Sequence, residues 1–235
     1  MRRLTLLLLP LLLLLCSCEV DEQLVTPVTE AFTGSAVCDY GFALRIEQSG
    51  GACIIFAEGG IEVSESPYAV HGTIEQTMYG EKLGTSVISF SDGVFTADDT
   101  ETEMTEEEFR AQLIYSPPLL FGSEDIKSAE RINTLSGTLY RWYIKDFTGS
   151  ERLYVLLGEG LPHTLGLAAV IEDETRFTDI VCEYTVSDDG NPVSYALTLT
   201  AVYQDTPPYV PGSAPKKSNY QTAVSVDYRV EYKRK

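Results

Sequence analysis

Two histidines carry the most versatile side-chain chemistry of the chain. His71 and His163 have no second histidine at i+2 or i+4 and no nearby cysteine, so the spacing of a zinc site is absent. A Ser-His-Asp triad can assemble across space, but the chain contains no Gly-x-Ser-x-Gly elbow. We therefore expect structural or surface histidines, no catalytic residue and no bound metal.

Three cysteines follow the first thirty residues, namely Cys38, Cys53 and Cys182. An odd number cannot all pair within one chain. Cys38 and Cys53 flank a glycine turn at 49–51, and a tight hairpin there would place Cys53 opposite Glu47. Cys38 would then lie roughly 30 Å away at ~3.3 Å per residue, whereas a disulfide needs Cα atoms within about 7 Å. We expect buried free thiols.

Acidic segments resemble calcium loops only superficially. The stretch from Asp98 to Glu108 lacks the glycine at the sixth position and the terminal glutamate of an EF-hand loop. Thr105 with Glu108 instead predicts the capping box of a helix, with Met104 and Phe109 as its hydrophobic staple. The run 187–191 has the composition of a β-turn. With no phosphate-binding glycine loop either, no cofactor is expected.

The N-terminus has the layout of a secretory signal peptide: Arg2 and Arg3, an apolar run from Leu4, and a small residue, Ser17, before Cys18. As a helix, its run of about fifteen apolar residues would span roughly 22 Å, short of a ~30 Å hydrocarbon core. The ending resembles the lipobox of bacterial lipoproteins, in which the signal is cut before a cysteine that carries a diacylglyceryl group. Cys18 fits this role better than Cys16, because the residue before Cys16 is a leucine.

Together with the length and the strand pattern of the remaining chain, this resemblance predicts three parts. Residues 1–17 are the signal peptide, residues 18–34 hold the lipidated Cys18 and a flexible tether, and residues 35–235 form a single β-rich domain. The protein would then lie outside the cytoplasm in the bacterial cell envelope, with the membrane as its partner through the lipid at Cys18.

The composition excludes one class of partner. The formal net charge is −18, and it becomes −20 without Arg2 and Arg3. Such a charge repels nucleic acid and anionic lipid headgroups. The 44% of hydrophobic residues, with fourteen tyrosines and nine phenylalanines, can fill a core. We expect no nucleic-acid partner, and no protein partner is identifiable.

Most of the chain alternates apolar and polar residues with a period of two, which predicts half-buried strands joined by hairpins. The predicted strands are 37–47, 52–57, 68–79, 85–90, 94–97, 138–145, 178–186, 193–203 and a last one around 224–232. Helices are predicted from Thr105, from Glu124 with Ile126, Ala129 and Ile132 on one face, and over 151–157.

The order of these elements resembles the LolA/LppX-like lipoproteins. The residues that carry the likeness are 91–95, with an Asp-Gly turn, and 184–203, with an Asp-Asp-Gly turn. The resemblance implies an α+β fold, mostly antiparallel β, in which a twisted open half-barrel sheet is covered by a few helices. It also implies an apolar cleft between sheet and helices, which some members use to carry lipids. No functional residue of the family can be matched position by position.

We therefore expect a membrane-anchored, non-enzymatic lipoprotein that binds a lipid or another apolar ligand. Inward residues of two strands form the expected lining: Tyr40, Phe42, Leu44, Ile46, Tyr195, Leu197 and Leu199. The alternative is that side chains fill the interior of a cell-surface structural or protein-interaction module with no small-molecule ligand. The cue for that alternative is the proline-rich segment 206–215.

Overall fold

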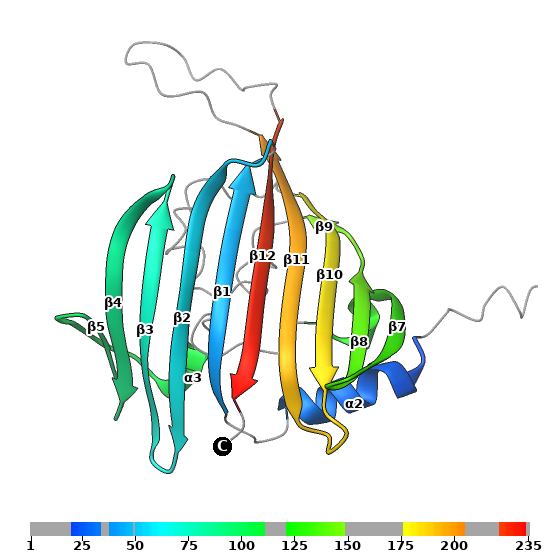
Figure 1. The fold of residues 1–235 in the computed structure, drawn as a ribbon, viewed down its shortest axis with the longest axis horizontal. Helices are drawn as coiled ribbons and strands as arrows, with labels where there is room; N and C mark the ends of the chain where they lie inside the picture. The colour runs from blue at the N-terminus through cyan, green and yellow to red at the C-terminus, as the bar shows by residue number, and fades with distance from the viewer. Residues whose placement is uncertain are drawn as a thin grey trace, which may run out of the picture.

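The computed structural model describes residues 20–33, 38–48, 50–110, 121–148, 176–204 and 221–233. These residues form one twelve-stranded sheet, two α-helices and a short 3-10 turn (Figure 1). The helices are α2 (Glu22–Thr33) and α3 (Glu106–Arg110), and the 3-10 turn is η1 (Ser123–Asp125). The strands are β1 (Asp39–Gln48), β2 (Cys53–Glu65), β3 (Tyr68–Met78), β4 (Glu81–Ser91), β5 (Val94–Ala97), β6 (Thr100–Glu103), β7 (Ile126–Thr134), β8 (Gly137–Ile144), β9 (Phe147–Thr148), β10 (Arg176–Val186), β11 (Pro192–Gln204) and β12 (Gln221–Lys233).

The strands pair in the order β6-β5-β4-β3-β2-β1-β12-β11-β10-β8-β7, and β9 pairs with β10. Every pair is antiparallel, and most neighbours are consecutive in the chain. The exceptions are the pair of β1 with β12, which places β12 between β1 and β11, and the pair of β10 with β8. Within the described ranges, β6 and β7 are the two edges and do not pair with each other. The predicted fold class, a mostly antiparallel open sheet with a few helices, is confirmed.

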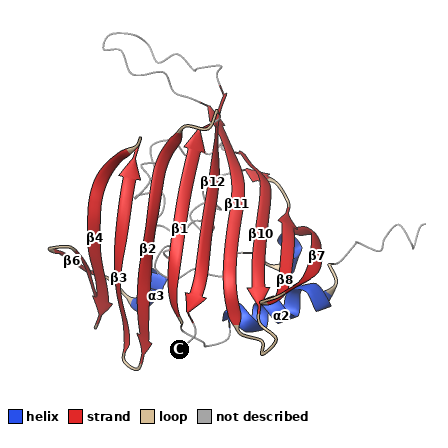
Figure 2. Cartoon of the chain, viewed as in Figure 1, coloured by secondary structure: helices blue, strands red, loops and turns tan. Residues whose placement is uncertain are grey.

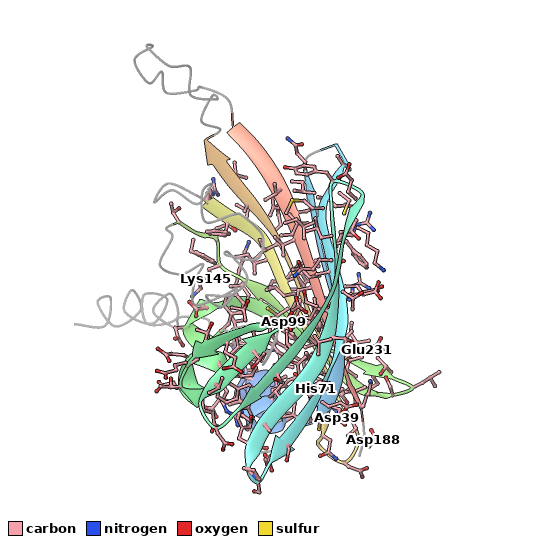
Figure 3. The ribbon with its side chains drawn as sticks, turned by 90° about the vertical axis from the view of Figure 1, so that its left-hand side faces the viewer. Asp39, His71, Asp99, Lys145, Asp188 and Glu231 are labelled. Atoms are coloured by element: carbon pink, nitrogen blue, oxygen red, sulfur yellow. The ribbon has the colours of Figure 1, made fainter. Side chains whose placement is uncertain are left out.

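The two faces of the sheet differ in burial. In β1, the side chains of Tyr40, Phe42, Leu44 and Ile46 are buried, and the residues between them are more exposed. We call the face with the buried side chains the inner face and the opposite one the outer face. Both helices lie against the inner face (Figures 1 and 2). Figure 3 turns the sheet edge-on and shows Glu231 on the side away from the helices.

The hairpins predicted from the sequence are confirmed. The β1–β2 hairpin places Cys53 opposite Glu47, as the position of its turn predicts, although β2 extends well beyond the predicted Ala57. Cys38, Cys53 and Cys182 are free thiols. Only Cys182 is buried, so the prediction of burial was wrong for the other two, which are half-buried near the ends of their strands.

The helix predicted from Glu124 is a strand. After η1 the chain continues as β7, which pairs with β8 through Glu130 opposite Arg141 and Ile132 opposite Leu139. Ile126 and Ile132 do not share a buried stripe, because Ile126 is buried and Ile132 is 37% exposed. The three-residue spacing of the apolar residues suggested a helix, but the hydrogen bonds offered by β8 determine the structure.

The tether predicted over residues 18–34 is, from Glu22 to Thr33, the packed helix α2. Asp21 begins it by accepting a 3.0 Å hydrogen bond on Oδ1 from the Gln23 amide. The apolar residues Val25, Val28 and Phe32 recur at helical spacing, and Val28 is fully buried. The polar and acidic composition of this segment predicts a tether, but its apolar stripe packs as a helix on the inner face. In the described part of the chain, helices that could span a membrane are absent.

The predicted start of α3 is confirmed. The Thr105 amide donates to Glu108 Oε2 at 2.7 Å, and the Glu108 amide donates to Thr105 Oγ1 at 3.2 Å. These two bonds form the reciprocal capping box. They fix a single helical turn, which places the Phe109 side chain in the core, where it is fully buried. The helix predicted over 151–157 lies outside the described residues.

Candidate functional site

The seven side chains predicted to line an apolar site all lie on the inner face, and each is at most 5% exposed. Strand β12 joins the β1 group to the β11 group. The cross-strand rows are Phe42–Val230–Tyr195, Leu44–Tyr228–Leu197 and Ile46–Val226–Leu199. The contribution of β12 was missed, because its alternation identifies a strand but not the strands that it pairs with.

Aromatic rings form a continuous cluster on the inner face of β8, β10, β11 and β12. Tyr184 is central, with its ring centroid 4.7 Å from that of Trp142 and 5.1 Å from that of Tyr195. Tyr195 in turn contacts Tyr228 at 6.2 Å, and Tyr228 contacts Phe42 at 6.4 Å. With Phe42 of β1, side chains from five strands thus make one wide apolar layer on the inner face.

Helix α2 covers one end of this cluster. Its Phe32 packs edge-on against Tyr184 at 5.2 Å and against Tyr232 at 5.6 Å. The Trp142 indole N–H donates a 3.0 Å hydrogen bond to the Leu24 carbonyl oxygen. This bond satisfies the one polar atom of the tryptophan side chain and attaches α2 to β8.

Two buried hydroxyl groups in the cluster lack such a partner. Tyr184 and Tyr195 are 1% and 2% exposed, and neither hydroxyl has a nitrogen or oxygen partner among the described residues. The Cys182 thiol lies beside both hydroxyls, and its hydrogen bonds with them, which are weak because sulfur is a weak donor and acceptor, add to the rise that burial causes in their pKa values. Burial raises the pKa of the Cys182 thiol to about 12 and the pKa values of both tyrosines well above 10, so all three groups stay protonated and neutral.

A second aromatic group lies at the other end of the inner face. The Phe109 ring of α3 stacks on Phe90 at 4.4 Å and contacts Phe95 at 5.7 Å. The Arg110 guanidinium lies 3.8 Å from the centre of the Tyr68 ring. Burial raises the pKa of Tyr68, and the positive charge of Arg110 partly opposes that rise. Helix α3 therefore anchors the β3–β5 side as α2 anchors the β8–β10 side.

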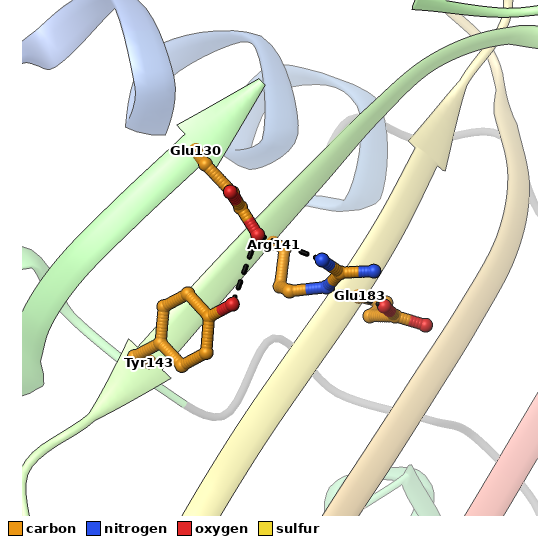
Figure 4. A network of polar contacts seen from close by, with 4 residues as sticks. All are labelled: Glu130, Arg141, Tyr143 and Glu183. Carbon is orange, nitrogen blue, oxygen red and sulfur yellow. Dashed lines mark hydrogen bonds and ion pairs between the residues drawn. The ribbon is translucent and has the colours of Figure 1, made fainter. Parts of the chain in front are cut away.

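The outer face carries charged side chains in register across its strands. Arg141 on β8 bonds Glu130 on β7 at 2.7 Å and Glu183 on β10 at 2.6 Å, and Tyr143 donates to Glu130 at 2.9 Å (Figure 4). The hydrogen bonds from Arg141 and Tyr143 lower the pKa of Glu130. These groups are solvated, so the network serves to fix the pairing of strands rather than to hold a reactive group.

Grooves on the outer face are open and polar. One of about 480 Å³ runs over Gly41, Ala43 and Thr73 between Glu58 and Arg229. Another of about 250 Å³ lies beside Arg141 and Thr198. Neither combines a buried polar atom with an apolar wall, so the inner face is the better candidate site.

The remaining predicted positions are less informative. His71 is an exposed residue of β3, opposite Glu62 on β2. Among the described residues, no three His, Cys, Asp or Glu side chains are grouped as metal ligands would be. Cys18, His163 and the proline-rich segment 206–215 lie outside the described residues.

Known proteins offer a distant comparison. No family model and no curated protein matches the sequence. Among solved structures, the lipoprotein LppX of Mycobacterium tuberculosis is similar with a TM-score of 0.40 and 9% identity, over 88% of this chain and 94% of that one. A LolA superfamily protein from Nitrosomonas europaea is similar with a TM-score of 0.29 and 10% identity, over 91% of this chain and 94% of that one. Both carry the names of the group that the layout of this sequence resembles.

Proposed function

We propose that this protein is a lipoprotein of the bacterial cell envelope, anchored through Cys18, that binds a lipid or another apolar ligand against its inner face and catalyses no reaction. The observation that carries the proposal is the wide aromatic and aliphatic surface on one side of an open sheet. Three rows of it join β1, β12 and β11 and include six of the seven residues of the predicted lining, and the seventh, Tyr40, lies opposite Tyr232 on β12.

The positions of the helices support this proposal. Both α2 and α3 lie near the end of the sheet where β1 begins (Figure 1). Ile46 is the eighth of the ten residues of β1, so it lies near the opposite end of the strand from the helices. Its row continues through Val226 to Leu199. An acyl chain that buries about 400 Å² against such a surface would gain on the order of 10 kcal/mol before the costs of binding.

The test is to extract and identify the lipids that co-purify with the protein. The full chain is expressed in a lipoprotein-processing bacterium, solubilised in a mild detergent and extracted with organic solvent, and the extract is analysed by mass spectrometry. The covalent lipid stays on the protein, so the extract reports only noncovalent ligands. We expect a defined lipid at a reproducible ratio to the wild-type protein.

A matched pair of variants locates the site. Phe42→Asp places a charge on the inner face, whereas Ala43→Asp places the same charge on the outer face one residue further along β1. Provided that circular dichroism shows both variants folded, Phe42→Asp should lose the lipid and Ala43→Asp should keep it. Equal lipid content in both variants, or no lipid above the background of an unrelated lipoprotein, would contradict the proposal. The second result would favour the structural or protein-interaction module.

A further inference from the structure

The hydroxyl groups of Tyr184 and Tyr195 are an unexplained feature of an otherwise apolar surface. The two residues face each other across β10 and β11, and each is at least 98% buried. Phenylalanine would supply the same ring and avoid the burial of a polar atom that has only the Cys182 thiol as a weak partner. Buried polar groups in proteins nearly always have a good partner, so two hydroxyls on adjacent strands that have only a thiol beside them in the described part of the chain mark a place for a stronger hydrogen-bond acceptor.

Among the described residues, the nearby side chains do not supply such an acceptor. The Trp142 N–H, in the same cluster, already donates to Leu24. Cys182, on the inner face beside them, offers only a weakly accepting sulfur. Because the pKa values of both tyrosines lie well above 10, both hydroxyls remain hydrogen-bond donors throughout the physiological range of pH.

The lack of buried charged side chains near Tyr184 and Tyr195 limits which ligand groups their hydroxyls can bind. Apart from Thr185 and Ser187, the buried residues that the structure describes are apolar or aromatic, and none is Lys or Arg. A carboxylate or phosphate placed there would be a buried charge without a counterion, which is strongly unfavourable. A carbonyl oxygen has two lone pairs and no charge, so one ester or amide carbonyl can accept a hydrogen bond from both hydroxyls.

The position of the pair suits a ligand that is otherwise apolar. Leu197 follows Tyr195 on the inner face of β11, and its row leads through Tyr228 to Leu44. A chain attached to a carbonyl between the two tyrosines would therefore continue over the predicted lining.

On the premise that the inner face binds an apolar ligand, we propose that Tyr184 and Tyr195 form a polar subsite that selects ligands with an uncharged carbonyl, such as acyl esters, over free fatty acids and plain hydrocarbons.

The test uses three probes of matched length: methyl undecanoate, undecanoate and dodecane. The mature protein is held in nanodiscs of fixed composition, and empty nanodiscs correct for partition of the probes. Trp142 is the only tryptophan of the chain and lies against Tyr184, so its fluorescence reports binding. Two additional hydrogen bonds predict that the ester binds about tenfold more tightly than the alkane. The carboxylate, at pH 8, should bind more weakly than the ester.

The double variant Tyr184→Phe/Tyr195→Phe should lose this tenfold preference for the ester and bind dodecane as the wild type does. Tyr143→Phe, which removes a hydroxyl from the outer face, is the matched control and should leave all three affinities unchanged. Equal binding of ester and alkane by the wild type would refute the subsite. A double variant that keeps the preference for the ester would also refute it and would indicate that water, not the ligand, bonds the hydroxyls. So would a double variant that loses affinity for the ester and the alkane alike. A wild type that binds none of the three probes would instead refute the proposed function, and the subsite with it.

Discussion

At the scale of single residues, Gly59 shows how tightly the inner face is packed. It lies on β2 opposite Phe42, and a Cβ added to it would clash with the Thr73 carbonyl oxygen and lie 2.8 Å from Phe42 Cε1. The carbonyl belongs to the backbone of β3 and cannot turn aside. Gly59 therefore allows both the pairing of β2 with β3 and the position of the Phe42 ring.

We expect Gly59→Ala to lower the free energy of unfolding by about 1–3 kcal/mol, because the extra methyl overpacks the sheet. The adjacent Gly60→Ala is the control, since its Cβ would meet only Lys233 Nζ at 4.0 Å. That change should stay within about 0.5 kcal/mol of the wild type. Urea denaturation of both variants checks the difference, and equal stabilities would show that the strands can separate to accept the methyl.

Single residues of the candidate site could be predicted in part. The alternation in 37–47 and 193–203 places Tyr40 to Ile46 and Tyr195 to Leu199 on buried faces, and the structure confirms that burial. The weakly bonded hydroxyls of Tyr184 and Tyr195 could not be found in this way. Whether a buried hydroxyl has a partner depends on which side chains lie across neighbouring strands, and only the three-dimensional register determines that.

At the scale of elements, local signals predicted structure well where the stabilising contacts are local. Both hydrogen bonds of the α3 capping box join Thr105 and Glu108, so a stretch of four residues is enough to predict this helix start. By contrast, β7 is a strand because β8 pairs with it, and α2 is ordered because the Trp142 indole and the buried inner face hold it. Those causes lie outside the segments themselves.

Removing the cap of α3 should therefore have a predictable cost. Thr105→Ala deletes the hydroxyl that bonds the Glu108 amide, and the loss of an N-cap typically lowers the free energy of unfolding by about 1 kcal/mol. Thr102→Ala, at an exposed position of β6, is the control and should have little effect. Chemical denaturation measures both, and an unchanged Thr105→Ala would mean that Phe109 holds the turn without its cap.

The same cap predicts a dependence on pH. Hydrogen bonds from Thr105 lower the pKa of Glu108, so the carboxylate stabilises the fold above its ordinary pKa, and this contribution is lost as the pH falls through the lowered value. We expect Glu108→Gln to be less stable than the wild type at pH 7, with the difference shrinking towards pH 3. Thermal melts across this range check it, and a difference that stays constant with pH would contradict it.

At the scale of the whole molecule, the described sheet is open with edge strands β6 and β7, and the chain has a strongly negative net charge. The edge strand β6 is exposed throughout and carries Glu101 and Glu103, which disfavour pairing with another chain. Alternating residues predicted a sheet of antiparallel hairpins, but the insertion of β12 between β1 and β11 could not be predicted. That pairing joins strands nearly two hundred residues apart, and no local pattern specifies it.

Anchoring is the property of the whole molecule that the N-terminal sequence predicts. In a lipoprotein-processing bacterium, we expect the wild-type chain to gain the mass of a diacylglyceryl group and to partition into the detergent phase, because the lipobox-like sequence predicts the thiol of Cys18 as the acceptor. Cys18→Ala should lose both properties. Cys16→Ala is the matched control and should keep them, because Leu15 is too large to precede a cleavage site. Mass spectrometry and detergent-phase partition measure the outcome, and equal masses with equal release of the wild type and Cys18→Ala would refute the anchor.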